Sequence, residues 1–198
     1  NSLKKQLKIN KNDFVFIFVG RVVGDKGINE LIKAFNIFSI NNDGIKLLIV
    51  GSFEENLDAL NQKTKKIINS NKSIIHVGYQ KDVRPFFSIS NVLAFPSYRE
   101  GFPNAVLQAG AMGIPSIVTN INGCNEIIIE DKNGMIIPVK NPEALLNAME
   151  KIYLNPSYYH MLKNKCRIII KNSFEQKYFW KELLKEYRSC KLEFNYEK

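Results

Sequence analysis

Short runs of consecutive apolar residues recur along this 198-residue chain, and they constrain its fold more than any other feature. A strand with one face in water alternates apolar and polar residues, whereas a strand covered on both faces is apolar throughout. Each run here is continuous, so we expect a parallel sheet with helices on both faces. The runs predict six strands, at residues 14–19, 46–50, 73–77, 91–95, 115–118 and 135–137.

Segments with helical spacing lie between these strands. In the first segment, apolar residues recur at Ile28, Leu31, Ile32, Phe35 and Phe38, which places them on one face of a helix. Strands that alternate with helices predict an α/β fold with a doubly wound, Rossmann-like, six-stranded parallel sheet. The expected helices cover residues 26–40, 54–68, 83–89, 101–112, 124–130, 142–154 and about 156–171.

Composition divides the chain into three parts. Residues 1–12 are polar and basic, and we expect a linker or N-terminal extension there. Residues 13–172 contain all the predicted strands and form the Rossmann-like domain. Residues 173–198 include a final helix, about 175–190, whose aromatic side chains could pack on this domain or on a domain that the chain lacks.

The net charge of +9 and the three cysteines bear on partners and location. Lysines gather near the amino end and again at residues 63–72, which indicates either a solvated basic surface or attraction to an anionic membrane face. The basic residues are scattered and no RNA-binding aromatic motif accompanies them, so nucleic-acid binding is not expected. No apolar run could span a bilayer, no signal peptide is visible, and the cysteines match no metal or complete disulfide set. We therefore expect a cytoplasmic protein.

Two loops are expected to form one ligand site. In a doubly wound sheet with strand order 3-2-1-4-5-6, ligands bind at the carboxyl ends of strands 1 and 4. Gly20 and Arg21 follow the first predicted strand, and Glu100 follows the fourth. Free backbone N–H groups where a helix begins favour anionic or hydroxyl-rich ligands. The plainer alternatives are a basic surface turn near Arg21 and a carboxylate at Glu100 that interacts only with the helix dipole.

An ordered series of motifs makes the prediction more specific. The motifs are Phe18-Val19-Gly20-Arg21, Asp25-Lys26-Gly27, Val77-Gly78-Tyr79, Glu100-Gly101-Phe102-Pro103-Asn104-Ala105 and Asn133-Gly134. Together they resemble the retaining GT-B glycosyltransferases, the large group 1 family of nucleotide-sugar enzymes, over most of the chain. The resemblance implies that residues 13–172 bind a nucleotide sugar as the C-terminal half of a GT-B fold. It also implies an N-terminal acceptor domain that this chain lacks.

The resemblance implies roles for particular residues. Gly20, Arg21 and Lys26 are expected to hold the donor diphosphate, because a guanidinium binds two phosphate oxygens and an ammonium adds a point charge. Glu100 is expected to accept hydrogen bonds from the donor sugar and, with Arg21 and Lys26, to form the catalytic set. The remaining expected contacts are Gly101, Phe102, Pro103, Asn104 and Ala105 at the sugar or phosphates, and Val77 and Tyr79 near the nucleobase.

Three further positions complete the expectations for the site. The family holds the ribose with a glutamate where this chain has Gln108, which keeps an acceptor oxygen but loses the charge. The change weakens such a hydrogen bond by roughly 1 kcal/mol. Two helical turns separate Gln108 from Glu100, so both are expected to face one pocket. His76 is interpreted as a structural residue, and Gly123 is expected at the rim of the cleft.

The activity implied by the resemblance is sugar transfer with retention of anomeric configuration. The donor would be a nucleoside diphosphate sugar, with a UDP-sugar favoured, and the acceptor a glycan or lipid-linked sugar, as in bacterial surface polysaccharide biosynthesis. No metal or other cofactor is expected, and the chain has no Asp-x-Asp pair. Two alternatives stay open: another GT-B enzyme such as a sugar-nucleotide epimerase, and a non-catalytic nucleotide-sugar-binding module. The isolated chain is expected to transfer poorly.

Overall fold

The computed structural model describes residues 2–194, without the side chains of Glu55, Leu57, Tyr178, Phe179 and residues 191–194. Its centre is a six-stranded sheet with the order β3-β2-β1-β4-β5-β6, in which every paired strand is parallel to its neighbour. The predicted doubly wound topology is therefore confirmed. The strands are β1 (Phe14–Val19), β2 (Ile45–Val50), β3 (Ile74–His76), β4 (Val92–Phe95), β5 (Ser116–Thr119) and β6 (Gly134–Ile137).

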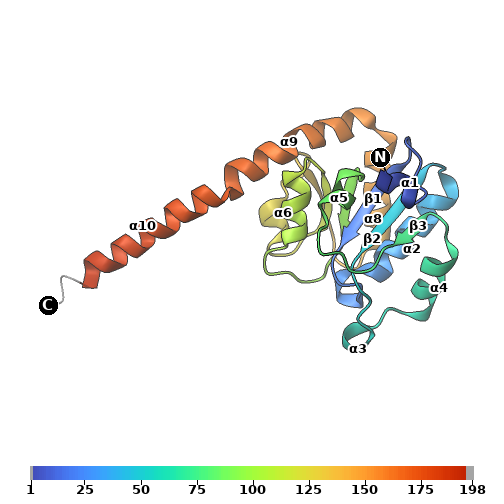
Figure 1. Cartoon of the computed structure of the whole chain (residues 1–198), viewed down its shortest axis with the longest axis horizontal. Coiled ribbons are helices and arrows are strands. Elements are labelled where there is room, and N and C mark those ends of the chain that lie inside the picture. The colour runs from blue at the N-terminus through green and yellow to red at the C-terminus, as the bar shows by residue number, and fades with distance from the viewer. Residues whose placement is uncertain (1, 195–198) are drawn as a thin grey trace.

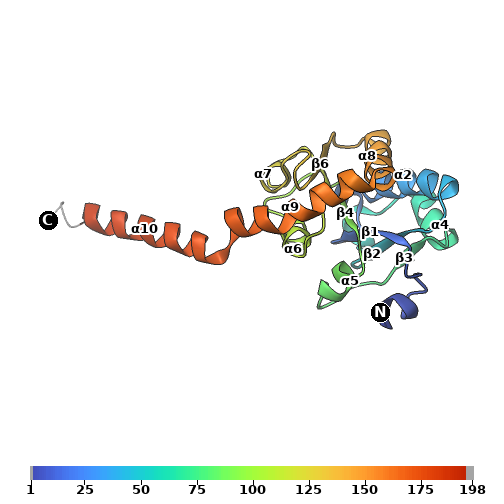
Figure 2. The ribbon, with the colours of Figure 1, turned by 90° about the horizontal axis from the view of Figure 1, so that it is seen from above.

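Helices cover both faces of the sheet. Figure 2 shows the strands between α2 with α8 on one side and α5 with α6 on the other. Among the described residues, the helices are α1 (Ser2–Gln6), a 3-10 turn at Gly24–Lys26, α2 (Ile28–Asn41), α3 (Glu55–Asp58), α4 (Gln62–Ser70), α5 (Arg84–Ser88), α6 (Asn104–Ala111), α7 (Cys124–Ile127), α8 (Pro142–Leu154), α9 (Pro156–Phe174) and α10 (Gln176–Phe194).

The core explains why most strand residues are apolar. Residues Val15 to Phe18 of β1 are completely buried, although their side chains point alternately to opposite faces of the sheet. Phe35 and Phe38 of α2 are also completely buried, and both pack edge-on against Phe16. Coverage from both sides leaves few strand positions at which a polar residue could reach water, and the partly exposed Lys46 of β2 occupies one of them.

Several helices differ from the sequence-based expectation. The expected linker contains α1, and Ile9 after it is buried, because apolar residues between the lysines can reach the core. The helix expected at 54–68 is two helices, since the Asn61 side chain accepts a hydrogen bond from Thr64 N (2.7 Å) and starts α4 afresh. The helix expected from residue 101 begins only at Asn104, after Pro103 in an extended conformation.

The last helix, α10, extends away from the sheet and its covering helices in both views (Figures 1 and 2). Three of its large side chains are half or more exposed, namely Trp180, Leu184 and Tyr187. The sequence predicted a helix at about 175–190, and α10 confirms it. Of the aromatic residues expected on it, Tyr187 is exposed, whereas the side chains of Tyr178 and Phe179 lie outside the described part. None of the helices in residues 2–194 is both long and apolar enough to cross a membrane.

Candidate functional site

The loops after β1 and β4 lie side by side at the carboxyl edge of the sheet. Tyr98 N donates a hydrogen bond to the Asp25 carbonyl at 2.8 Å and ties the two loops together. Gly27 has a positive φ of 70°, and a Cβ atom there would lie 2.0 Å from the Pro96 carbonyl oxygen. Only glycine permits this approach. The prediction that the loops containing Arg21 and Glu100 open on one edge is confirmed.

A charged hollow of about 490 Å³ lies between these loops. Lys26 and Glu100 form an ion pair in its wall, with Nζ and Oε1 only 2.6 Å apart and each side chain 14% exposed. Arg99 pairs with Asp25 at 3.1 Å. The hollow therefore carries three cationic and two anionic side chains, and an anion entering it meets a net positive charge. Its lining residues are Arg21, Asp25, Lys26, Arg99, Glu100 and Gly101.

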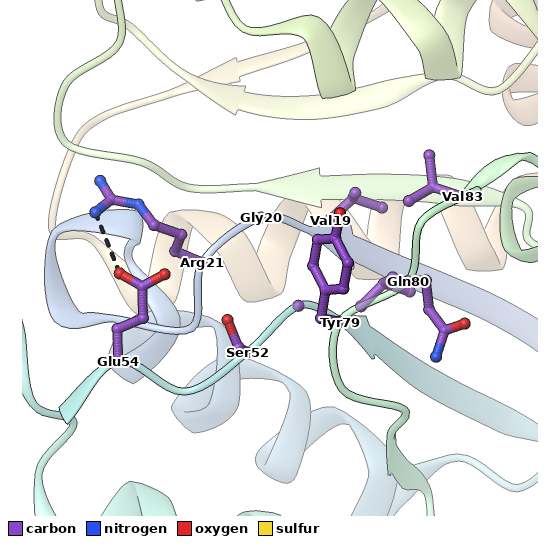
Figure 3. A pocket seen from close by; sticks show the side chains of 10 residues that line it. Val19, Gly20, Arg21, Ser52, Glu54, Tyr79, Gln80 and Val83 are labelled. Carbon is purple, nitrogen blue, oxygen red and sulfur yellow. Dashed lines mark hydrogen bonds and ion pairs between the residues drawn. The ribbon is translucent and has the colours of Figure 1, made fainter.

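A second hollow, of about 260 Å³, opens beside the first. Figure 3 shows Arg21 and Glu54 on one side of it, Val83 and Gln80 on the other, and Tyr79 between them. Three valines make much of its wall apolar, which suits a flat ring. Arg21 lines both hollows, so it stands where one passes into the other. The lining is Val19, Gly20, Arg21, Val50, Gly51, Ser52, Glu54, Tyr79, Gln80 and Val83.

His76 supports the floor of this second hollow. Its Nε2 lies 2.7 Å from the Gly51 carbonyl oxygen, and its ring meets Phe53 edge-on with centroids 4.5 Å apart. These contacts agree with the structural role expected for His76. Val77 is half-buried, and its carbonyl accepts a hydrogen bond from Gln80 Nε2 at 2.9 Å. Of the two residues expected near a nucleobase, Tyr79 lines the hollow, whereas Val77 is not among its lining residues.

The turn after Glu100 is held from two directions. Gly101 lines the charged hollow, and its carbonyl oxygen lies 2.3 Å from where a Cβ atom on Gly123 would stand. The half-exposed Phe102 ring contacts Phe174 at the end of α9, with centroids 5.6 Å apart. Pro103 is buried. The loop after β5 and the end of α9 therefore both help to fix the loop that carries Glu100.

The expected residues on α6 are less close to the hollows. Asn104 and Gln108 are exposed and Ala105 is half-buried, and none of the three is among the lining residues of either hollow. The expected role of Gln108 at a ribose stays a prediction.

Sequence reasoning missed several residues that the structure brings to the site. Glu54 is the chief one: its Oε2 lies 3.4 Å from Arg21 Nη1, and it lines the apolar hollow. Ser52, Gln80 and Val83 line the same hollow. One signal could have found Glu54, because the predicted second strand ends at Val50 and the ends of parallel strands share one edge of the sheet.

The electrostatics of the site depend on burial. Cys124 lies next to the ion pair, and burial raises the pKa of its thiol to about 12, with the Glu100 charge adding to the effect and Lys26 opposing it. Burial also raises the pKa of Tyr98, helped by a hydrogen bond with Glu30. Both groups are therefore neutral near pH 7. Among the side chains that the structure describes, no group of three or more His, Cys, Asp or Glu residues could hold a metal ion.

Comparison with known proteins points in one direction. The family model described as glycosyl transferases group 1 matches residues 1–169. A capsular polysaccharide biosynthesis glycosyltransferase, CapM of Staphylococcus aureus, is 30% identical over 186 residues, which cover 94% of this chain and 49% of that protein. A UDP-Gal:alpha-D-GlcNAc-diphosphoundecaprenol alpha-1,3-galactosyltransferase of Escherichia coli is 29% identical over 174 residues, covering 86% of this chain and 44% of that one.

Solved structures match the fold. A glycosyltransferase from Rickettsia africae superposes with a TM-score of 0.83 and 21% identity, over 95% of this chain and 50% of that one. Sucrose-phosphate synthase from Thermosynechococcus elongatus gives a TM-score of 0.79 and 24% identity, over 94% and 48% of the two chains. The chain thus spans about half the length of the relatives it matches.

Proposed function

The chain belongs to the group 1 glycosyltransferases, and we propose that it is the donor-binding half of an enzyme that transfers a sugar from a nucleoside diphosphate sugar. Its doubly wound sheet is that of the GT-B glycosyltransferases. The observation that carries the proposal is the position of Arg21, where an apolar hollow meets a hollow lined by Lys26 and Glu100. A nucleobase, a diphosphate and a sugar are joined in that order in the donor.

Each part of the donor has a matching group. The nucleobase occupies the apolar hollow between the valines and Tyr79. Arg21 and Lys26 bind the diphosphate and stabilise the negative charge that grows on it as the sugar departs. The Glu100 carboxylate accepts hydrogen bonds from the sugar hydroxyls and orients the anomeric carbon. We further propose that transfer proceeds with retention of anomeric configuration and requires no metal ion, since two cationic side chains supply the positive charge.

The acceptor is proposed to be a glycan or a lipid-linked sugar, as in surface polysaccharide assembly. Support comes from the relatives from S. aureus and E. coli, which are described as a capsular polysaccharide biosynthesis glycosyltransferase and as a galactosyltransferase that acts on a sugar diphosphoundecaprenol. Because these relatives are about twice as long, we place the acceptor site on a further N-terminal domain. The 198-residue chain alone is then expected to bind donor and to transfer little sugar. A lipid-linked acceptor would bring the enzyme to an anionic membrane face, where lysines such as Lys4, Lys5 and Lys8 favour contact.

A ligand-observed NMR screen tests the proposal directly. The purified chain is mixed with UDP, GDP, ADP and their sugar conjugates, and saturation transfer to the base and ribose protons is recorded. We expect one nucleotide class to bind, with UDP favoured, and the matching nucleotide sugar to compete with it. Circular dichroism establishes that the purified chain is folded. If the folded chain binds no nucleoside diphosphate, the proposal is wrong. Binding combined with an inactive full-length protein would instead favour the non-catalytic binding module.

A further inference from the structure

Glu54 is a carboxylate in an otherwise largely apolar wall. It follows β2, whose carboxyl end opens on the same edge of the sheet as the ends of β1 and β4. Among the 10 described residues that line the apolar hollow, Glu54 is the single acidic one. Its side chain is 32% exposed. A charge that is partly withdrawn from water in such a wall costs free energy unless it has a polar partner.

The contact between Glu54 and Arg21 only partly meets this need. The Nη1 to Oε2 distance of 3.4 Å is longer than the 2.7–2.9 Å or so of a strong charge-assisted hydrogen bond. The Arg21 side chain is also 47% exposed, and exposed ion pairs contribute little. A carboxylate can accept about four hydrogen bonds. Glu54 therefore retains acceptor capacity, and its second oxygen points away from Arg21, toward the side on which Ser52 and Tyr79 lie (Figure 3).

The chemistry of the donor indicates which of its groups lies next to the Glu54 carboxylate. In a nucleoside diphosphate the ribose lies between the base and the first phosphate. Glu54 lines the hollow proposed for the base and contacts Arg21, which is proposed to bind the diphosphate. The part of the nucleotide that lies next to Glu54 is then the ribose, which carries two neighbouring hydroxyls. Two hydroxyls on adjacent carbons match the two oxygens of one carboxylate.

We propose that Glu54 binds the ribose hydroxyls of the donor nucleotide and makes the site selective for ribonucleotides; this inference rests on the proposed function. In dinucleotide-binding α/β folds an acidic residue after the second strand holds a ribose in the same way, with phosphate at the loop after the first strand. Here the neutral Gln108 is exposed on α6, and the negative charge nearest the base hollow is that of Glu54.

The test compares ribo- and deoxyribonucleotides against two variants. Binding of UDP and 2′-deoxy-UDP to the 198-residue chain is measured by calorimetry or NMR titration, with GDP and 2′-deoxy-GDP in parallel. We expect the parent chain to prefer the ribonucleotide by roughly tenfold or more, the scale of a hydrogen bond to a charged group. In Glu54→Ala this preference should disappear. The matched control is Asp82→Asn, which removes another arginine-paired carboxylate, one that does not line the hollow, and should keep the preference.

The outcomes separate this inference from the proposed function. A Glu54→Ala chain that weakens ribo- and deoxyribonucleotide equally would show that Glu54 acts only through Arg21, and would overturn the inference alone. Tighter binding of both nucleotides would show that Glu54 merely competes for Arg21, with the same consequence. If the parent chain binds neither UDP nor GDP, the proposed function fails and this inference fails with it. Amide spectra of the variants establish that each is folded.

Discussion

Lys26 Nζ lies 2.6 Å from Glu100 Oε1, so the residue expected to hold the diphosphate and the residue expected to hold the sugar contact each other directly. The two are 74 positions apart in the chain. Without ligand each charge neutralises the other in a setting where both are largely buried. In the proposed complex, the donor offers phosphate oxygens to the ammonium and hydroxyls to the carboxylate. The ion pair therefore keeps both groups in place before the donor arrives.

Removal of either partner of this ion pair should destabilise the protein. Lys26→Met or Glu100→Gln leaves a largely buried charge without its partner, and we expect each to lower the free energy of unfolding by about 1–3 kcal/mol. The double variant should lose less than the sum of the two. Urea denaturation of the four proteins gives the coupling energy. Strictly additive losses would mean that the ion pair contributes nothing to stability.

Arg21 should contribute most of the affinity for the diphosphate. Arg21→Ala is expected to weaken binding of UDP or GDP by roughly 1.5–3 kcal/mol, the scale of a charged hydrogen bond. Calorimetry on the purified chain measures this. Arg84→Ala is the control, since Arg84 also pairs with a carboxylate, Asp82, but does not line either hollow. Equal affinity of parent and Arg21→Ala would remove Arg21 from the site.

Two substitutions of Gln108 should change the affinity for nucleotides slightly and in opposite directions. If it still approaches the ribose, Gln108→Glu should tighten nucleotide binding and Gln108→Ala should weaken it, each on the order of 1 kcal/mol, because one hydrogen bond is strengthened or removed. NMR titrations with the tightest-binding nucleotide resolve such changes. Identical affinities for all three proteins would show that Gln108 has no part in binding. That result fits its exposed position on α6.

The cysteines should differ in reactivity. Cys124 and Cys166 are buried, which raises the pKa of each thiol to about 12, whereas Cys190 is exposed. We expect an aromatic disulfide reagent to label one thiol rapidly at pH 8 and all three after unfolding. Because the native state keeps the protons of the two buried thiols, stability is lost as pH rises above the ordinary thiol pKa of about 9. Rapid labelling of three thiols in folded protein would contradict this.

Chelation should leave donor binding unchanged. In this proposal Arg21 and Lys26 neutralise the diphosphate, so a divalent cation has no necessary place there. UDP affinity is measured by calorimetry with excess EDTA and with added Mg²⁺ or Mn²⁺. We expect one affinity under all conditions. Loss of binding on chelation and its recovery with one cation would overturn the expectation of a metal-free site.

Much of the fold followed from the sequence because burial on both faces leaves a strong signal. The run from Phe14 to Val19 has no polar position, and it forms β1, whose four central residues are completely buried. The helix bounds were less accurate, because single side chains decide them. Asn61 restarts a helix by capping α4, and such a contact is invisible to apolar periodicity.

The site was predicted where two motifs marked it and missed where none did. Arg21 and Glu100 follow strands whose ends the topology brings together, so their common edge could be predicted. Glu54 follows β2, which ends at the same edge of the sheet, but no motif indicated a functional role for it. The ion pair between Lys26 and Glu100 depends on side-chain conformation, which a sequence pattern does not encode.

The placement of β4 beside β1 has a consequence for the nascent protein on the ribosome. Strands β1 to β3 pair with one another and can assemble as soon as they emerge, because their connections are local. The second half of the site waits until β4 is synthesised and inserts along the free edge of β1. A chain stalled before that point would expose the apolar edge of β1 together with an unpaired Lys26. Translation of β4 and of Glu100 is therefore the step that covers this edge of β1 and gives Lys26 its partner.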